Sequence, residues 1–233
     1  MDPKRILLKL TGTILLDTDG KLSSVHITQL VRQLYALRSS HQFGIVIGGG
    51  NFFRGNQHGT AMGLQPTTAH QVGMLATMMN GLIIRNICTQ LGLNTSVLCA
   101  LPCPTVGQLV SEHTIQQAQQ RGDIIIFTGG TGNPFFTTDT TAVLRALQMG
   151  ADEIWKATDV DGIYHADPRK QPDARFIPAT TYNEALRQNL AIMDSTAYTL
   201  AAQHNLVIRV FNAFAPDAFI QAAHNQTFGS ILA

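Results

Sequence analysis

Three glycine-rich stretches in this sequence each follow a short apolar run, and two of them carry a cation. They are Lys9-Leu10-Thr11-Gly12, the stretch from Gly48 to Gly55 that contains Arg54, and residues 128–140, which read TGGTGNPFFTTDT. Glycine lets the backbone come close to a ligand, and successive free N–H groups form a concave site for an anion. Lys9 and Arg54 would add full positive charges. The pattern therefore predicts a polyphosphate site assembled from several loops.

The common single-loop phosphate motifs do not occur in this sequence. There is no GxxxxGK[ST], and no GxGxxG follows the first apolar run. A glycine-rich turn on its own is about as often structural as it is ligand-binding. The interpretation therefore depends on three such turns occurring together at the ends of apolar runs.

Composition favours a globular domain that binds neither nucleic acid nor membranes. Of the 233 residues, 45% are hydrophobic and only 13% are charged, with a formal net charge of +1. A weakly charged surface is consistent with burial in an oligomer, and no basic stripe indicates a nucleic-acid partner. We expect no signal peptide and no apolar segment near the ~20 residues that span a bilayer, and hence a cytoplasmic protein.

The cysteines and histidines do not predict a metal site. Cys88, Cys99 and Cys103 lack CxxC spacing and are expected to be buried thiols in a reducing compartment. The eight histidines show no HExxH or other paired spacing, so no dedicated metal site is expected.

Short apolar runs predict six strands, which alternate with segments that have apolar residues at helical spacing. The strands are expected at residues 5–10, 43–47, 95–99, 123–127, 152–156 and 206–211, and the helices at residues 27–38, 69–91, 112–120, 139–149 and 195–203. The predicted buried side of the long helix holds Met74, Leu75, Met78, Leu82 and Ile83. This alternation favours a mainly parallel sheet with helices on both faces, and ligands bind such sheets beyond the carboxyl ends of the strands.

Residues 157–178 hold several Pro, Asp and Gly with little periodicity. A stretch of this length without regular structure is typically a lid or a binding loop. Lys156, which ends the strand before it, is expected to face the same crevice, and the sequence assigns it no role.

A longer series of motifs resembles the bacterial-type UMP kinases (uridylate kinases) of the amino acid kinase superfamily. It covers nearly the whole chain in the right order and comprises residues 9–12, 47–55, 73–80, 130–139, 156–164, 167–168, 193–194 and 209–212. GTGNPFFTTD, residues 130–139, is the most specific of these motifs.

The resemblance implies a fold and a reaction. The fold is a three-layer α/β sandwich around a mainly parallel sheet, with residues 1–233 forming a single domain. The N-terminal part would bind the acceptor nucleotide, and roughly residues 150–233 the ATP. The reaction is ATP + UMP → ADP + UDP in pyrimidine nucleotide biosynthesis, with Mg²⁺ held mainly by the nucleotide phosphates. A homohexamer activated by GTP and inhibited by UTP is also implied.

The resemblance also implies site residues. The catalytic residues would be Lys9, Asp139 and, as an assistant, Asp194. ATP would contact Lys9, Leu10, Thr11, Gly12, Gly50, Arg54, Thr158, Tyr164 and Asp167. UMP would contact Gly49, His70, Thr131, Gly132, Asn133, Pro134, Phe135, Phe136, Thr137 and Thr138.

Several of these residues also have a purely structural interpretation. Phe135 and Phe136 are as well explained by core packing. Asp139 suits the N-cap of the next helix, a role compatible with catalysis. Lys9 could cap a strand end, and Tyr164 could anchor a long loop.

Two positions depart from the family pattern. Thr13 stands where a glutamate is usual, although Thr11 keeps the hydroxyl before it. His70 stands where the family has an aspartate that binds the ribose hydroxyls of UMP. A carboxylate accepts from both hydroxyls, whereas a neutral imidazole offers one acceptor and one donor. We hypothesise weaker UMP binding or a shifted acceptor preference, unless Gln71 or Thr68 takes over.

Two other functions compete with UMP phosphorylation. One is a divergent nucleotide-binding regulator with weak activity, which the presence of Lys9, Asp139 and Asp167 opposes. The other is a superfamily kinase acting on a small carboxylate, which the GTGNPFFTTD motif opposes.

Overall fold

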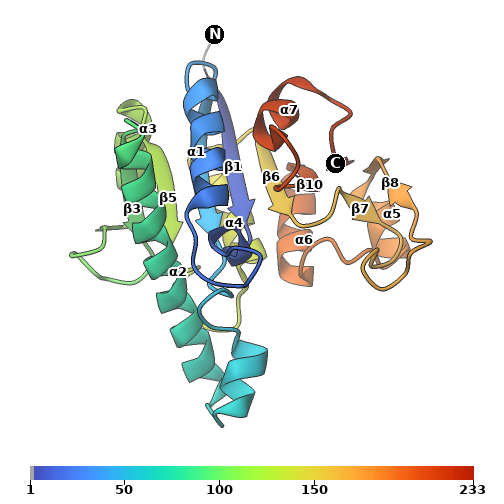
Figure 1. Cartoon of the computed structure of the whole chain (residues 1–233), viewed down its shortest axis with the longest axis horizontal. Coiled ribbons are helices and arrows are strands. Elements are labelled where there is room, and N and C mark those ends of the chain that lie inside the picture. The colour runs from blue at the N-terminus through green and yellow to red at the C-terminus, as the bar shows by residue number, and fades with distance from the viewer. Residues whose placement is uncertain (1–2) are drawn as a thin grey trace.

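The fold is built on one twisted sheet of nine strands, seen in a computed structural model that describes residues 3–233 (Figure 1). In spatial order the strands are β4 (Gln108–Leu109), β3 (Thr95–Cys99), β5 (Ile124–Thr128), β2 (His41–Ile47), β1 (Lys4–Leu10), β6 (Glu153–Thr158), β10 (Val207–Asn212), β11 (Ser230–Leu232) and β9 (Ala179–Thr180). Among the strands that the structure describes in this sheet, only the β10–β11 pair is antiparallel. The predicted mainly parallel α/β sandwich is confirmed.

Helices cover both faces of the sheet and make two separate hydrophobic cores. The first core contains buried residues of α1 (Val25–Leu37), α2 (Pro66–Gln90) and α7 (Ala218–His224). The second contains buried residues of α3 (Glu112–Gln120), α4 (Thr138–Met149), α5 (Tyr182–Arg187) and α6 (Ser195–Gln203). Figure 1 shows α1 and α7 in front of the central strands, with α4 and α6 behind them.

Alternation along the central strands decides which side chains meet which helices. In β1, Leu8 packs in the first core and Leu7 in the second. Successive side chains of a strand point to opposite faces, so Lys9 lies on the face of Leu7. In β6, Ile154 packs in the second core, and Lys156 therefore lies on that face too. Both lysines thus lie on the side of the sheet that α4 covers.

The predicted elements are found, with ends that differ by at most three residues. The largest shift is the start of α2, at residue 66 instead of 69. The prediction missed α5, α7 and β11, together with the two-residue strands β4 and β9 and the separate antiparallel pair of β7 (Ile163–Tyr164) and β8 (Phe176–Ile177). These elements are only two to seven residues long, too short for a clear periodic pattern in the sequence. They form because they pack or pair with segments that are distant in the sequence. Residues 157–178 are therefore a loop that folds back on itself through β7 and β8.

Two expectations about buried residues need correction. Leu75 is 53% exposed, because it lies on the outer side of α2, whereas Met74 and Met78 are buried. Cys88 and Cys99 are buried as predicted, but Cys103 is only partly buried.

The expectation that no segment is long and apolar enough to cross a membrane is also wrong. By length and composition α2 passes that test, and 44% of its most apolar window is buried inside the molecule. One helix of this kind is weak evidence for a membrane span, since a core helix passes the same test. The packing of α2 in the first core supports that interpretation.

Gly81 lets α2 pack closely on β5, and this contact generates a test of the fold. A Cβ at Gly81 would lie 2.3 Å from Cγ2 of Thr128, whereas a Cβ at Gly73 of the same helix has open space. Gly81→Ala should lower the free energy of unfolding by about 1–3 kcal/mol through overpacking. Gly73→Ala is the matched control and should be neutral or stabilising by up to about 1 kcal/mol, from helix propensity alone. Urea denaturation checks both variants, and equal effects would contradict the proposed packing.

Candidate active site

Two lysines lie side by side at the carboxyl ends of the central strands, with one carboxylate between them. The parallel register of β1 and β6 pairs Lys9 with Lys156. Asp139 reaches them from the first turn of α4. Its Oδ1 lies 2.9 Å from Nζ of Lys9, and its Oδ2 lies 2.8 Å from Nζ of Lys156. The cluster holds two cations and one anion, so an excess positive charge faces whatever ligand binds there.

Burial and the neighbouring charges set the protonation of this cluster. Burial alone would raise the pKa of the Asp139 carboxyl, but the ammonium groups of Lys9 and Lys156 outweigh it and hold that pKa below its ordinary value. Burial lowers the pKa of Lys156, and the nearby Asp139 opposes this shift. The stabilising contribution of Asp139 is therefore complete above pH 3.8, its ordinary value, and is lost as the pH falls through the lower folded value.

Threonines and a second aspartate hold the start of α4 in place. Asp139 is not the N-cap that the sequence indicated; the cap is Thr137, whose Oγ1 accepts from the backbone N–H groups of Asp139 and Thr140. Asp194 caps α6 and also accepts from the hydroxyls of Thr137 and Thr140. Asp194 thus ties α6 to the first turn of α4. It fixes the position of Asp139, and its own oxygens are taken up by these bonds.

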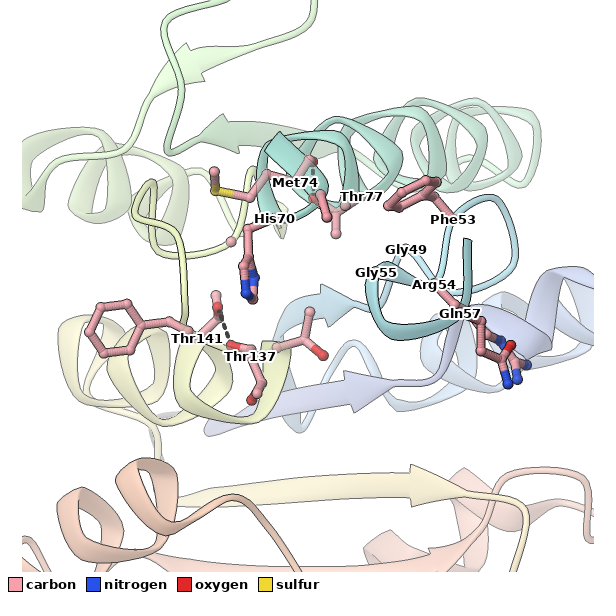
Figure 2. Close-up of a pocket in the computed structure, with 15 residues that line it drawn as sticks. Gly49, Phe53, Arg54, Gly55, Gln57, His70, Met74, Thr77, Thr137 and Thr141 are labelled. Carbon is pink, nitrogen blue, oxygen red and sulfur yellow. Dashed lines mark hydrogen bonds between the residues drawn. The ribbon is translucent and has the colours of Figure 1, made fainter. Parts of the chain in front are cut away.

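One cleft, of about 440 Å³, opens between α2 and the loop that leads into α4 (Figure 2). Its lining residues are Gly49, Phe53, Arg54, Gly55, Gln57, Ala69, His70, Gly73, Met74, Thr77, Gly130, Phe136, Thr137, Thr138 and Thr141. None of them carries a carboxylate, and the one permanent cation is Arg54. Figure 2 shows His70 reaching from α2 into the cleft toward Thr137 and Thr141.

Half of the predicted UMP-binding residues line this cleft. Gly49, His70, Phe136, Thr137 and Thr138 do so, whereas Thr131, Gly132, Asn133, Pro134 and Phe135 do not. Thr131, Gly132 and Asn133 form a tight turn in which Thr131 Oγ1 accepts from the Asn133 N–H.

The two phenylalanines of the GTGNPFFTTD motif are not core residues. Phe135 is 66% exposed and Phe136 45% exposed, so the core-packing interpretation of these rings is wrong. Phe135 has a φ of 71°, a conformation that is strained for a side chain other than glycine. Its ring lies 5.0 Å from that of His70, at the mouth of the cleft. A strained, exposed aromatic residue beside a cleft is typical of a ligand-binding loop.

Sequence reasoning missed two threonines of this cleft. Thr77 Oγ1 accepts from the Gly129 N–H and donates to the Met74 carbonyl, which fixes the start of the glycine loop against α2. Thr141 Oγ1 donates to the Thr137 carbonyl. Thr141 lies one helical turn beyond Thr137, and Thr77 one turn beyond Gly73, so helical spacing from recognised residues was the available signal.

Three residues predicted to contact ATP, Arg54, Leu10 and Gly12, have structural contacts of their own. Arg54, predicted to contact ATP, lines the cleft that contains His70, and its Nε donates to the Gly50 carbonyl. Leu10 is fully buried in the first core, so its side chain cannot contact a nucleotide. The space that a Cβ at Gly12 would fill holds Oδ1 of Asn51 at 2.5 Å. Any larger residue at position 12 would clash with Asn51, so the close packing of these two loops requires a glycine there.

A second cleft, of about 350 Å³, lies on the other side of the lysine pair. Its lining includes three residues predicted to bind ATP, Thr158, Tyr164 and Asp167, together with Lys156. The Tyr164 ring packs edge-on against Phe176 at 5.5 Å, which anchors it to β8. Asp159, His165 and Arg169 also line this cleft and were not predicted.

The two clefts converge on the lysine cluster. Thr138 lines the first cleft, Lys156 lines the second, and Asp139 follows Thr138 and pairs with Lys156. The arrangement can hold one anionic ligand on each side of a two-cation centre, as the transfer of a phosphoryl group requires.

Asp139→Asn tests the electrostatic role of this carboxylate. Two neighbouring, mostly buried ammonium groups would lose their shared partner, so we expect a loss of about 2–4 kcal/mol in the free energy of unfolding. Inorganic tripolyphosphate should then raise the melting temperature of the variant more than that of the wild type. The exposed Asp173→Asn is the control. A variant as stable as the wild type, with the same response to tripolyphosphate, would contradict the assigned role.

Known proteins share this chain's sequence over nearly its full length. The model of the amino acid kinase family matches residues 4–212. The uridylate kinase of Paramagnetospirillum magneticum is 38% identical over 232 residues, which cover 99% of this chain and 96% of that protein. The uridylate kinase of Mycoplasma pneumoniae is 40% identical over 225 residues, covering 95% of each.

Solved structures share the fold as well. The crystal structure of UMP kinase from Ureaplasma parvum superposes with a TM-score of 0.95 at 33% identity, covering 100% of both chains. The UMP kinase of Bacillus anthracis gives a TM-score of 0.93 at 32% identity, over 99% of this chain and 96% of that one. The sequence match, the fold and the motifs that meet at the two clefts agree: this chain belongs to the amino acid kinase family and, within it, to the uridylate kinases.

Proposed function

We propose that this protein transfers the terminal phosphoryl group of ATP to UMP, giving ADP and UDP. The observation that carries the proposal is the Lys9–Asp139–Lys156 cluster where two clefts meet. Relatives named uridylate kinase, similar over nearly the whole chain, support UMP as the acceptor. In the reaction, the bond between the γ-phosphorus and the β,γ-bridging oxygen breaks. A new bond forms to a phosphate oxygen of UMP.

The two lysines would neutralise charge on the group in transfer. Phosphoryl transfer needs positioning and charge stabilisation more than covalent help from the protein. Lys9 and Lys156 are already fixed by Asp139, so little reorganisation is needed when the phosphates arrive. The positive end of the α4 helix dipole points toward the same place. Lys156 therefore joins Lys9 as a proposed catalytic residue, with Asp139 and Asp194 as positioning residues.

The Mg²⁺ that this reaction requires would arrive with the nucleotide. Within residues 3–233 no group of three or more His, Cys, Asp or Glu is placed to hold a metal ion. Both oxygens of Asp139 are paired with lysines, and those of Asp194 accept from threonines and backbone N–H groups. In this proposal the phosphates of ATP would be its main ligands. When bound, the ion would withdraw charge from the phosphates.

We assign the first cleft to the acceptor and the second to ATP. The first cleft draws on residues 49–141 and the second on residues 156–210, in agreement with an acceptor side in the N-terminal part and a donor side from about residue 150. In the second cleft, Asp167 would bind the ATP ribose and Tyr164 would flank the adenine. We further propose that the protein is a cytoplasmic homohexamer regulated by GTP and UTP. Light scattering in the presence of each nucleotide would measure the mass of the assembly.

The two competing functions fit less well. A regulator without turnover does not need two lysines fixed between two clefts. A kinase for small carboxylates would not require the long acceptor cleft between α2 and the α4 loop. The relatives at 38–40% identity are named uridylate kinases, which also favours a nucleotide acceptor.

A coupled assay with ATP, Mg²⁺ and a panel of acceptors tests the function. The panel contains UMP, CMP, dUMP, AMP, GMP and several amino acids. We expect turnover with UMP above all other acceptors. Nucleotide binding without turnover on any acceptor would favour the regulator, and turnover on a carboxylate alone would overturn the proposal.

His70→Asp tests acceptor recognition in the first cleft. The ring of His70 lines the cleft, whereas the exposed Thr68 and Gln71 do not, so His70 is placed to contact the sugar. A carboxylate would accept from both ribose hydroxyls, and we expect the KM for UMP to fall roughly tenfold with kcat within about twofold. Preference for UMP over dUMP should rise. The control is Gln71→Asp, which adds the same negative charge at the neighbouring residue, outside the cleft. If the KM for UMP and the preference among UMP, CMP and dUMP both stay unchanged, the hypothesis that His70 affects acceptor binding is wrong.

A further inference from the structure

Arg169 joins two carboxylates on the rim of the second cleft. Its Nη1 lies 3.0 Å from Oδ2 of Asp159, and its Nε lies 3.0 Å from Oδ1 of Asp167. Its Nη2 donates to Oδ2 of Asp167 at 3.3 Å. The guanidinium thus contacts both oxygens of Asp167 and still reaches Asp159, and all three side chains line the cleft.

The two carboxylates belong to different parts of the chain around the cleft. Asp159 directly follows β6, and Asp167 lies between β7 and β8. Only the planar fork of an arginine can hold one carboxylate by two parallel bonds and a second carboxylate at the same time. The guanidinium therefore fixes the orientation of Asp167 relative to the end of β6.

This contact contributes little to the stability of the fold. The side chain of Arg169 is 63% exposed, and those of Asp159 and Asp167 are 48% and 30% exposed. Exposed ion pairs contribute little to stability because water screens them. Asp167 also keeps local backbone bonds, since its Oδ1 accepts from the Arg169 N–H and its carbonyl accepts from the N–H groups of Lys170 and Gln171. The turn should therefore survive loss of the guanidinium.

We propose that Arg169 is a positioning residue for the phosphoryl donor, which holds the Asp167 carboxylate ready to accept from the ribose hydroxyls of ATP. The inference rests on the proposed function, in which the second cleft binds ATP. A carboxylate oxygen has two lone pairs. Oδ1 of Asp167 already accepts from the N–H and the Nε of Arg169, but among the described residues Oδ2 accepts only from Nη2 and can also accept from a ribose hydroxyl. Fixing its rotamer beforehand removes an entropic cost that binding would otherwise meet.

The experiment compares Arg169→Ala with Lys170→Ala in the full chain. Lys170 is the neighbouring cation, does not line the cleft, and supplies the same loss of charge. Calorimetry measures binding of Mg²⁺–ATP and of Mg²⁺–2′,3′-dideoxy-ATP, which lacks both ribose hydroxyls. Steady-state kinetics with UMP supply KM and kcat.

For Arg169→Ala we expect ATP affinity to fall roughly threefold to tenfold, with a matching rise in KM and an unchanged kcat. Dideoxy-ATP should bind the variant and the wild type alike. Arg169→Lys should recover little of the lost ATP affinity, since an ammonium group cannot form the paired bonds of a planar guanidinium. Lys170→Ala should bind ATP as the wild type does.

Several results would overturn the inference. Equal losses with ATP and dideoxy-ATP would show that Arg169 acts on the phosphates or on the fold. Tighter ATP binding by Arg169→Ala would show that it competes with the nucleotide for Asp167. Full recovery by Arg169→Lys would show that charge alone matters. Failure of the wild type to phosphorylate UMP would overturn the proposed function, and the two binding measurements would still decide the role of Arg169.

Discussion

The site depends on a single carboxylate that is shared by two lysines on neighbouring strands. The register of β1 and β6 places Lys9 beside Lys156, and two like charges at that distance repel each other at a mostly buried position. Asp139 removes that repulsion only if α4 begins at the right place above the sheet. Its start is fixed by the cap of Thr137 and by the bonds from Thr137 and Thr140 to Asp194. The packing of β1, β6, α4 and α6 therefore determines where the two ammonium groups lie.

The same constraint explains why the ligand clefts lie on opposite sides of the cluster. The chain crosses from the first cleft to the second through α4 and β6, and Asp139 and Lys156 lie near the two ends of that connection. The first cleft is lined by α2 and by the exposed Phe136, whereas the second is lined by β7 and the residues that follow it, up to Arg169. In the proposed reaction, each nucleotide would contact its own loop, and the phosphates of both would lie near the shared lysines.

Much of this could be predicted from the sequence, because its strongest signals are local. Apolar runs located the central strands, and glycines at their ends located the site. Local pattern could not supply contacts between distant segments. The role of Lys156 follows from its register with Lys9, and the bonds that Asp194 accepts from Thr137 and Thr140 depend on a helix far away in the sequence. The exposure of Leu75 and the burial of Leu10 likewise depend on which elements pack against them. Asp139 looked like a helix cap because the true cap, Thr137, lies two residues earlier.

In the proposed reaction, the paired lysines stabilise the negative charge that develops on the phosphoryl group during transfer. The most direct test is the kcat of Lys9→Gln with saturating ATP and UMP, with Lys4→Gln, a change at the more exposed start of the same strand, as the control. We predict that kcat falls by about 100-fold or more in Lys9→Gln, while KM for both substrates changes far less. A kcat within about threefold of the wild-type value, in a folded variant, would contradict the account.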